Sequence, residues 1–556
     1  MLFVLINWLI IFVSSYPIGR IVNIRIKNDI NLVQNVIVGL IFNSIIMSTL
    51  AFFMPINSNI LYGLCLLNTS LLVFDFSYYK KLIATIKQRL NTKQLFMLFF
   101  ASIVLAIYSA AYSKINDDGL YYTQTIKWLG EYGFVHGISN LHVSLGLSSA
   151  WHILQSVYIF SDSVYTNDLN GFVFLIYTFL IVSRIANKTI TLFSITQYSV
   201  VLFLSVPFLS APNPDFPVIV FTAIALDLFM LKENYKGILL IACFGITIKI
   251  TAIFLLCLGG YCFFMERKKK IASPFLLLMI AAIFTLHISK NIFQTGYPLY
   301  PIKAFSINQL DWITPEPVID YFIHGIKSWS YSDEYKPLEV ENQYKKDIIN
   351  ELILLLGRGG TKGLINKFIL GTALISLMVF VREGVRKRLS FSESIMLIFG
   401  FLNFIIWLLF APQYRFILPV FVFFISLLIY YAFDKPIIKN NNWVTNFLIG
   451  FYSIMFLVGL FGINISSGST SKEIGQVDRL TSETLILPAS QYVFNDVDSI
   501  LINNKYYYHP TQNRYCWNVS LPCMSIGYEK VMLKDFHLRI SQRTENLKDG
   551  FTINNQ

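Results

Sequence analysis

Long apolar runs separated by short polar connections fill the chain from residue 1 to about residue 465. A helix needs about twenty apolar residues to cross the hydrocarbon core of a bilayer. Runs of this kind predict single spans at 1–16, 31–55, 59–77, 95–112, 168–184, 191–211, 215–231, 271–289, 364–381, 391–410, 416–433 and 444–465. The pattern therefore predicts an all-α polytopic membrane protein.

Composition excludes several other classes of protein. The 556 residues are 55% hydrophobic and only 14% charged, whereas charged residues make up about a quarter of a soluble globular chain. A soluble enzyme, a disordered scaffold and a coiled coil are therefore excluded. The net charge of +12 does not indicate nucleic acid, because residues 466–556 carry nine basic and nine acidic side chains and are neutral. The whole surplus lies among the membrane segments.

The surplus basic residues indicate the orientation of the spans. They cluster in short connections, which the positive-inside rule assigns to the cytoplasm. The clusters are Arg20, Arg25 and Lys27; Lys80, Lys81, Lys87, Arg89 and Lys93; Arg267 to Lys270; and Arg382, Arg386, Lys387 and Arg388. A transmembrane domain is thus expected over 1–465, with outer loops at 113–167 and 290–362. Residues 466–556 are expected to form a small extracytoplasmic α+β domain.

The segment 237–264 predicts a broken pair of helices. Basic residues flank both of its ends, so it is expected to cross an even number of times, yet it is too short for two full spans at 1.5 Å per residue. Two short helices meeting near Thr247 to Thr251, with Lys249 at the break, satisfy both conditions. The total is then about fourteen crossings. The segment 148–160 is expected to be a helix at the membrane surface or dipping into it.

The C-terminal region has shorter apolar stretches, which favour strands in TLILPA and SILINNKYYY, and a pattern that favours a helix over 528–549. Cys516 and Cys523 lie close together in CWNVSLPC. A disulfide in an oxidising compartment is the natural interpretation, and two free thiols are the alternative. The nearby His509 has no partner at metal-ligand spacing.

The motif NDDGLYY brings two adjacent carboxylates, Asp117 and Asp118, to the outer end of a span, ahead of Tyr121 and Tyr122. Partial desolvation raises the proton affinity of a carboxylate, which suits a general base. No cofactor is assigned, although a carboxylate pair can hold a divalent cation. The alternative is that these residues cap the following helix, and the pattern does not decide between the two.

Two further charged residues lie near the same face. Asp215 follows a proline-rich turn in SAPNPDFP, where either a functional acid or a helix cap fits. Lys249 lies within an apolar stretch, where an ammonium group is costly and is a functional hypothesis by default. Snorkelling of Lys249 to an interface is the alternative.

Arg415 lies in a tight outer turn, APQYRFILP, next to Tyr414. A guanidinium on this face favours an anionic ligand such as a lipid phosphate, which it can hold in a bidentate manner. Contact with ordinary lipid headgroups is the alternative. The aromatic residues beside prolines in TGYPLYPIKAF fit an interfacial belt slightly better than a sugar platform. His136, His142 and His152 lack the spacing of a metal site.

The ordered set NDDGLYY, NPDFP, KIT and QYRFILP resembles the GT-C superfamily of integral membrane glycosyltransferases. The segments GEYGFVHGISNLHVSLGLSSAW, TGYPLYPI and CWNVSLPC look like a bacterial branch of such proteins. The resemblance covers roughly residues 95–420 and the cysteine pair. It implies transfer of a sugar from a polyprenyl-phosphate donor to a glycan, lipid or protein acceptor on the outer face of the bacterial cytoplasmic membrane.

The resemblance also implies roles for individual residues. Asp118 or Asp117 would deprotonate the acceptor, and Asp215 would be a helper acid. Lys249 and Arg415 would neutralise the donor phosphate. Substrate contacts are implied for Tyr121, Tyr122 and Tyr414. Superfamily members often carry an acid-x-Asp or Asp-Glu motif, whereas this chain has Asp117-Asp118-Gly119, which leaves open which acid acts.

Two other classes of function compete with the transferase. A surface-polysaccharide polymerase or ligase would depend on Arg415 and Arg358 and tolerate loss of Asp118. A solute transporter or lipid flippase would show an inverted repeat with matching broken helices, and the sequence shows one broken region rather than two. Neither class involves nucleic acid as a partner.

Overall fold

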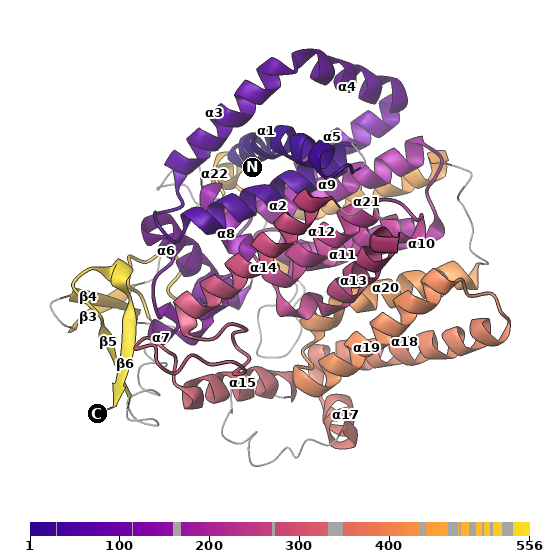
Figure 1. The fold of residues 1–556 in the computed structure, drawn as a ribbon. Helices are drawn as coiled ribbons and strands as arrows, with labels where there is room; N and C mark the ends of the chain where they lie inside the picture. Colours follow the sequence, from indigo (N-terminus) through magenta and orange to yellow (C-terminus); the bar gives the residue numbers. More distant parts are fainter. Residues whose placement is uncertain are drawn as a thin grey trace.

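Helices make up most of the chain, and short strands near its C-terminus lie at one end of the helical bundle (Figure 1). The structure is a computed structural model. It describes residues 1–28, 31–113, 115–159, 168–268, 273–331, 348–433, 438, 441–464, 476–477, 480–488, 496–502, 505–511, 515–524 and 538–555.

The helices follow one another in three groups. The first group contains α1 (Leu2–Arg25), α2 (Leu32–Leu50), α3 (Ser58–Phe74), α4 (Phe76–Arg89) and α5 (Thr92–Ala110). Short helices follow: η1 (Asp118–Tyr122), α6 (Thr123–Tyr132), α7 (Ile138–Leu141), η2 (Val143–Leu147) and α8 (Ala150–Val157). The third group contains α9 (Leu169–Ala186), α10 (Leu192–Ser205), η3 (Val206–Phe208), α11 (Asp215–Met230), α12 (Tyr235–Ile248), η4 (Ile250–Ala252), α13 (Ile253–Lys268), α14 (Pro274–Thr295), α15 (Glu316–Tyr331), α17 (Ile348–Gly357), α18 (Gly360–Val385), α19 (Phe391–Phe410), α20 (Tyr414–Ala432) and α21 (Asn441–Phe461).

The polar connections supply the signals that start several of these helices. The Asn91 side chain accepts a hydrogen bond from the backbone N–H of Gln94, and the Gln94 side chain accepts one from the backbone of Asn91. Ser390 and Glu393 form the same reciprocal box at the start of α19. Such boxes satisfy N–H groups that have no partner within the helix. Helix boundaries are therefore encoded locally, between the apolar runs.

Within the described residues, ten helices are long and apolar enough to cross a membrane, or eleven if α3 and α4, bent by 83° at their junction, form one span. The prediction of an all-α multi-pass membrane protein is confirmed at this level. Every predicted span has a helical counterpart, but α10, α11 and α12 have 14, 16 and 14 residues. The total of fourteen crossings therefore stays a prediction.

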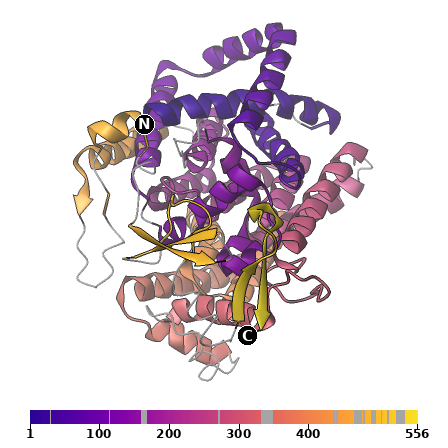
Figure 2. The same cartoon turned by 90° about the vertical axis from the view of Figure 1, so that its left-hand side faces the viewer.

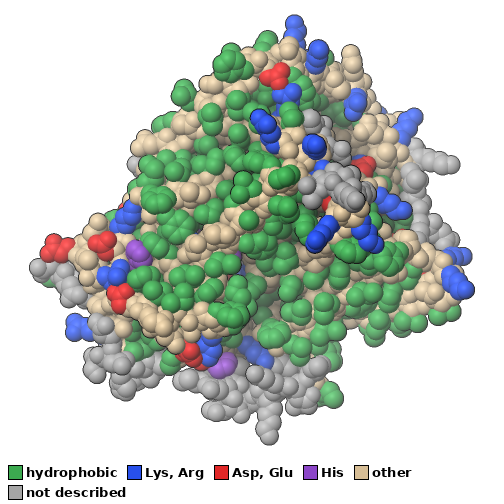
Figure 3. Space-filling view, viewed as in Figure 1, with side chains coloured by type: hydrophobic (Ala, Val, Ile, Leu, Met, Phe, Trp, Pro, Cys, Tyr) green, Lys and Arg blue, Asp and Glu red, His purple; other side chains and the backbone are tan. Residues whose placement is uncertain are grey.

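Figure 3 shows hydrophobic side chains over much of the bundle surface, and many Lys and Arg side chains along its upper and right-hand edges. The C-terminal strands lie on the left of the same view (Figure 1). Further Lys and Arg side chains lie on the left and at the bottom of the same view. The sidedness of the chain therefore stays a prediction.

The broken pair has the form that the sequence predicts. Helix α12 ends at Ile248, Lys249 is extended with φ −156° and ψ 136°, and the short turn η4 leads into α13. The two helices pack against each other. The predicted helix at 148–160 is α8, whose eight residues are all buried. It packs against α2, α6 and α12 inside the protein, and its depth in the membrane stays a prediction.

The C-terminal region contains three two-stranded antiparallel sheets and one short helix, α22 (Ser482–Ile486). The pairs are β1 (Ile463–Asn464) with β2 (Gln476–Val477), β3 (Val497–Ile502) with β4 (Lys505–Pro510), and β5 (Leu538–Gln542) with β6 (Phe551–Asn555). The hairpin β3–β4 confirms the strands predicted in SILINNKYYY. The disulfide between Cys516 and Cys523 is also confirmed.

Two predictions for this region are wrong. TLILPA begins in α22 instead of a strand, because the Thr481 hydroxyl caps the backbone N–H of Thr484 and starts a helical turn. The helix predicted over 528–549 is instead strand β5 followed by turns, within its described part; residues 528–537 lie outside the described residues. Leu538 and Ile540 are buried while Arg539 is exposed, which is the alternation of a strand.

The C-terminal strands β3 to β6 lie against the helical part of the molecule (Figure 2), and they share a hydrophobic cluster with the segment 121–145. Phe551 lies in this cluster, its backbone N–H donates to the carbonyl of His136 (3.0 Å), and its carbonyl accepts from the Asn140 amide (3.1 Å). Arg543 also pairs with Asp311 of the second predicted outer loop at 2.9 Å. The last strands of the chain therefore complete the packing of both loops.

Candidate functional site

Four of the charged residues singled out in the sequence meet as two ion pairs. The Arg415 guanidinium donates to Asp117 at 2.5 Å, across 298 residues of sequence. The Lys249 ammonium pairs with the Asp215 carboxylate. These groups come from four different segments: the connection before η1, the start of α20, the break between α12 and α13, and the start of α11.

One aromatic ring links the two ion pairs. The Phe416 ring centroid lies 4.5 Å from the Lys249 ammonium and 5.0 Å from the Arg415 guanidinium carbon. Side-chain exposure is 27% for Arg415, 21% for Asp117 and 18% for Lys249, against 2% for Asp215. Both cations therefore line one partly open site, where a ligand can reach them.

Asp117 is held in its charged form. Burial opposes ionisation, but the Arg415 guanidinium, assisted by the Lys249 ammonium and the Tyr122 hydroxyl, keeps the pKa of this carboxyl below its usual value. The Tyr122 hydroxyl donates to the same carboxylate at 3.4 Å. Asp117 thus serves as a permanent counter-charge for the two cations.

Asp118, its neighbour, is in the opposite state. It is 1% exposed, and the Thr123 hydroxyl donates to one of its oxygens at 2.8 Å. The other oxygen is buried with no hydrogen-bond partner among the described residues. Burial raises the pKa of this carboxyl to about 7, and the Asp117 charge adds to the increase, against the hydroxyl groups of Ser113 and Thr123. A carboxyl with this pKa can accept or release a proton near neutral pH.

The capping interpretation of the acid pair is wrong. Asp117 precedes η1 without a side-chain capping bond, and Asp118 accepts from a side-chain hydroxyl instead of the backbone. Asp215 occupies the first turn of α11, where its charge suits the helix dipole, but its carboxylate is engaged by Lys249. The snorkelling interpretation of Lys249 is likewise not supported, because its ammonium pairs with the Asp215 carboxylate.

Aromatic residues form one wall beside the acids. Tyr121 and Tyr122 are buried, and their rings lie 6.5 and 5.0 Å from the His152 ring. Burial, with the positive charges of Lys290 and Lys249, lowers the pKa of His152 to about 3, so the imidazole is neutral. In the sequence, His152 suggests only a metal ligand, and no local pattern indicates its place in this wall.

The remaining candidates occupy different positions. Tyr414 is half-buried at the first residue of α20, directly before Arg415. Arg358 is 8% exposed and donates to the backbone carbonyls of Trp329 and Ser330, at 2.9 and 2.6 Å. It therefore ties the end of α15 to the connection between α17 and α18.

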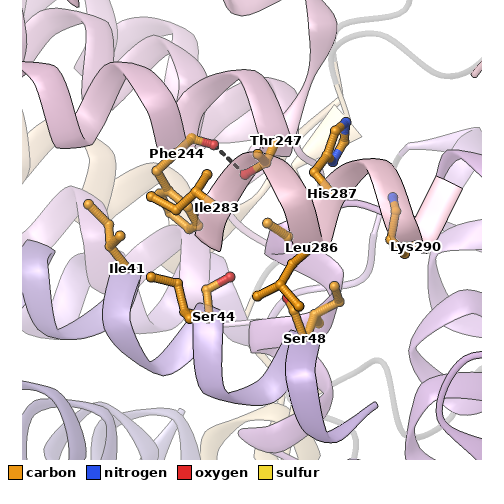
Figure 4. A pocket seen from close by; sticks show the side chains of 12 residues that line it. Ile41, Ser44, Ser48, Phe244, Thr247, Ile283, Leu286, His287 and Lys290 are labelled. Carbon is orange, nitrogen blue, oxygen red and sulfur yellow. Dashed lines mark hydrogen bonds between the residues drawn. The ribbon is translucent and has the colours of Figure 1, made fainter. Parts of the chain in front are cut away.

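A separate pocket lies between α2, α8, α12 and α14 (Figure 4). Apolar side chains line most of it, with His287 and Lys290 at one end. Ala150 and Ile153 of α8 contribute to it, while His152 on the same helix faces Tyr121 and Tyr122. The pocket thus adjoins the charged site from the other side of α8. The sequence predicts Lys290 at the start of a loop, whereas α14 continues to Thr295 and Lys290 lies within the helix.

A divalent cation at the acid pair stays a prediction. Among the residues that the structure describes, no group of three His, Cys, Asp or Glu side chains lies close enough to hold a metal ion. Asp117 and Asp215 each engage a basic side chain instead.

The pairing of Lys249 with Asp215 predicts a test of stability. Asp215→Asn leaves Lys249 without its counter-charge. Breaking such a pair, whose carboxylate is buried, costs about 3–5 kcal/mol, which corresponds to a melting temperature roughly 3–4 °C lower in detergent for a chain of this length. The double variant Asp215→Asn/Lys249→Met removes both charges and is expected to regain most of the loss. Equal melting temperatures for the wild type and Asp215→Asn would contradict the pair.

The comparisons with known proteins give one match. Residues 1–422 match the family DUF8201, described as a domain of unknown function. Searches of curated proteins and of solved structures found no match. The matched region contains both ion pairs and Asp118, and it ends before the disulfide loop. Because the match covers well over half of the 556 residues, the chain belongs to the DUF8201 family.

Proposed function

We propose that this protein is a membrane glycosyltransferase that moves a sugar from a polyprenyl-phosphate donor to an acceptor hydroxyl. The observation that carries the proposal is the following combination: a buried carboxyl, Asp118, with a pKa of about 7, follows directly on Asp117, and Asp117 pairs with one of two partly exposed cations that share one aromatic ring. A base and a bound pair of cations are the two groups that this reaction needs.

In the proposed reaction, the acceptor oxygen bonds to the anomeric carbon of the sugar while the bond from that carbon to the phosphate oxygen breaks. Ionised Asp118 takes the proton from the acceptor hydroxyl. The polyprenyl phosphate leaves with the electron pair of the broken bond, and its added negative charge is stabilised by Arg415 and Lys249. The guanidinium can bind two phosphate oxygens at once.

The paired carboxylates have a supporting role in this scheme. Asp117 and Asp215 keep Arg415 and Lys249 in place and neutralised before the donor binds. The donor phosphate then competes for the exposed side of each cation. Tyr121, Tyr122 and Tyr414 lie next to these groups in the sequence, and we assign them to contacts with the sugar or the phosphate. Asp215 is thus a positioning residue and not a second base.

We place the reaction on the outer face of the bacterial cytoplasmic membrane. The basic clusters mark the opposite ends of the helices as cytoplasmic. The acceptor is then a cell-surface glycan, lipid or protein. The donor stays in the bilayer, so only its sugar and phosphate need to reach the site.

The competing functions have less support. A polymerase that depends on Arg358 is disfavoured because that guanidinium binds two backbone carbonyls. A transporter built on matching broken helices is disfavoured because the second bend, between α3 and α4, carries Asp75 paired with Arg20 of a basic cluster. The two breaks therefore do not meet at a common site.

The proposal is tested by deleting the gene in its native host and analysing the surface glycans and lipid-linked sugars by mass spectrometry. A transferase predicts glycans that lack one sugar, together with accumulation of the polyprenyl-phosphate sugar. Chains of altered length with normal composition would favour the polymerase. A donor confined to the cytoplasmic leaflet would favour the transporter. Unchanged glycans and lipids would overturn the proposal.

A further inference from the structure

The loop closed by the disulfide docks directly on the acid motif. The Trp517 backbone N–H donates to the Gly119 carbonyl at 2.9 Å. The Gln124 side chain donates to the carbonyls of Trp517 and Val519 at 2.8 and 3.0 Å. The Lys127 ammonium donates to the carbonyls of Asn518 and Val519 at 3.2 and 3.1 Å. A segment almost 400 residues away in sequence is thus fixed to η1 and α6.

The indole of Trp517 lies against Gly119, the residue after Asp118. A methyl group added at Gly119 would come within 2.5, 2.8 and 2.9 Å of three indole carbons. Glycine at this position therefore allows the ring to approach the backbone of the acid motif. This contact explains why the motif NDDG ends in glycine. A tight turn does not explain it, because Gly119 lies inside the short helix η1.

The loop holds Trp517 in an unfavourable backbone conformation. Its φ is +43°, in the left-handed region that bulky residues rarely adopt. Such conformations persist where the surroundings over-determine them, and they cluster at functional sites. The disulfide supplies part of this restraint, and Cys516, Val519 and Cys523 pack together against Tyr508 of β4. The Tyr508 N–H also donates to the carbonyl of Pro522 at 3.0 Å.

The indole is half-buried and pairs with Tyr515, whose ring centroid lies 6.3 Å away. A partly open aromatic face against the acid motif suits the apolar face of a sugar ring, because aromatic groups combine a large apolar surface with a polar edge. Side chains in such sites orient a ligand only when they are held rigidly.

We propose that the Cys516–Cys523 loop forms the saccharide-binding wall of the site, with Trp517 as the residue on which a sugar ring stacks. The inference rests on the proposed function and adds to it a residue outside the family match. The shared ligand chemistry is a pyranose ring, which either the donor or the acceptor supplies. The disulfide acts through Trp517, so the cysteines are positioning residues.

The test uses full-length variants in membranes of the deletion strain. The probes are the polyprenyl-phosphate sugar and the unmodified glycan, both purified from that strain. Trp517→Ala is expected to raise KM at least tenfold for the substrate that stacks, and Trp517→Phe, which keeps an aromatic face, to raise it threefold or less. If KM changes only for the lipid-linked sugar, the donor stacks on Trp517. If KM changes only for the glycan, the acceptor stacks on it.

Gly119→Ala provides an independent arm, because it alters no polar group and displaces the indole. It is expected to reproduce the KM change of Trp517→Ala and to expose the loop to protease. The double variant Cys516→Ser/Cys523→Ser is also expected to raise KM and to expose the loop to protease. Tyr506→Ala is the matched control, since Tyr506 is an aromatic residue of the neighbouring strand β4 with 60% exposure, and it is expected to leave KM unchanged.

The outcomes separate this inference from the proposed function. If Trp517→Ala and Gly119→Ala both leave KM and product unchanged while Asp118→Asn abolishes transfer, the saccharide wall is wrong and the transferase stands. If Trp517→Ala lowers protein level or melting temperature, Gly119→Ala decides. Normal KM in Gly119→Ala, with its loop protease-sensitive, overturns the inference.

Discussion

Replacing Asp118 by asparagine is expected to lower the rate of sugar transfer by about 10²–10⁴-fold, which is the usual contribution of a general base. The amide has nearly the same shape as the carboxyl and still accepts the hydrogen bond from Thr123, but it cannot take up a proton. Transfer is measured in membranes with the lipid-linked donor, at matched protein level. Activity equal to that of the wild type would remove Asp118 from the mechanism.

The same variant predicts a characteristic dependence on pH. The base acts in its ionised form, so transfer by the wild type is expected to rise as the pH increases through about 7, the pKa of Asp118. Because the folded protein binds this proton more tightly than the unfolded chain, the stability contribution of Asp118 is largest at low pH. It falls as the pH rises from about 4 to about 7.

Asp118→Asn removes this loss of stability. The variant is expected to melt at a higher temperature than the wild type at pH 8, and to show a smaller difference at pH 5. An inactive protein that is more stable than the wild type is the signature of a functional acid, whereas loss of a helix cap would lower stability by about 1 kcal/mol. Asp117→Asn is the matched comparison, and it is expected to destabilise because it leaves Arg415 without its carboxylate.

Replacing Arg415 by glutamine is expected to reduce transfer by about 10²–10³-fold, as for the loss of one donor that stabilises a developing anion. The change removes the group that binds the leaving phosphate. Arg415→Lys is expected to recover only part of the rate, because an ammonium cannot bind two oxygens in the fixed geometry of a guanidinium. The measurement is kcat and KM for the polyprenyl-phosphate sugar.

Lys303→Gln serves as the control for Arg415. Lys303 is another cation of a predicted outer loop, paired with Asp320 at 2.8 Å on the surface. It is expected to leave transfer unchanged. If Arg415→Gln alters kcat no more than Lys303→Gln does, Arg415 contacts only lipid headgroups, and the phosphate site lies elsewhere.

The sequence was sufficient to find the charged residues of the site but not their partners. Asp117, Asp215, Lys249 and Arg415 stand out because charged groups beside apolar runs are costly and rare. Which carboxylate faces which cation depends on how α11, α12 and α20 pack, over separations of 34 and 298 residues. No local pattern encodes such a pairing.

The residues that the sequence does not reveal each have a separate cause. Trp517 lies in a polar tail, and its role follows from a contact with a glycine whose missing side chain gives no positive signal. The apolar pattern predicts that the span ends at residue 289 and so places Lys290 in a loop, whereas α14 runs to Thr295. The two wrong predictions for the C-terminal region, at TLILPA and over 528–549, arise because short segments fit both the helical and the strand period.

The contacts between the C-terminal strands and the segment 119–140 also affect biosynthesis. Phe551 and Trp517 cover His136, Asn140 and Gly119, yet they are made some 400 residues later. The earlier segments must therefore wait, with an apolar surface uncovered, until residues 517–551 have been synthesised. A chain that stops before Trp517 is expected to leave that surface open to chaperones and proteases, which would limit the lifetime of incomplete copies.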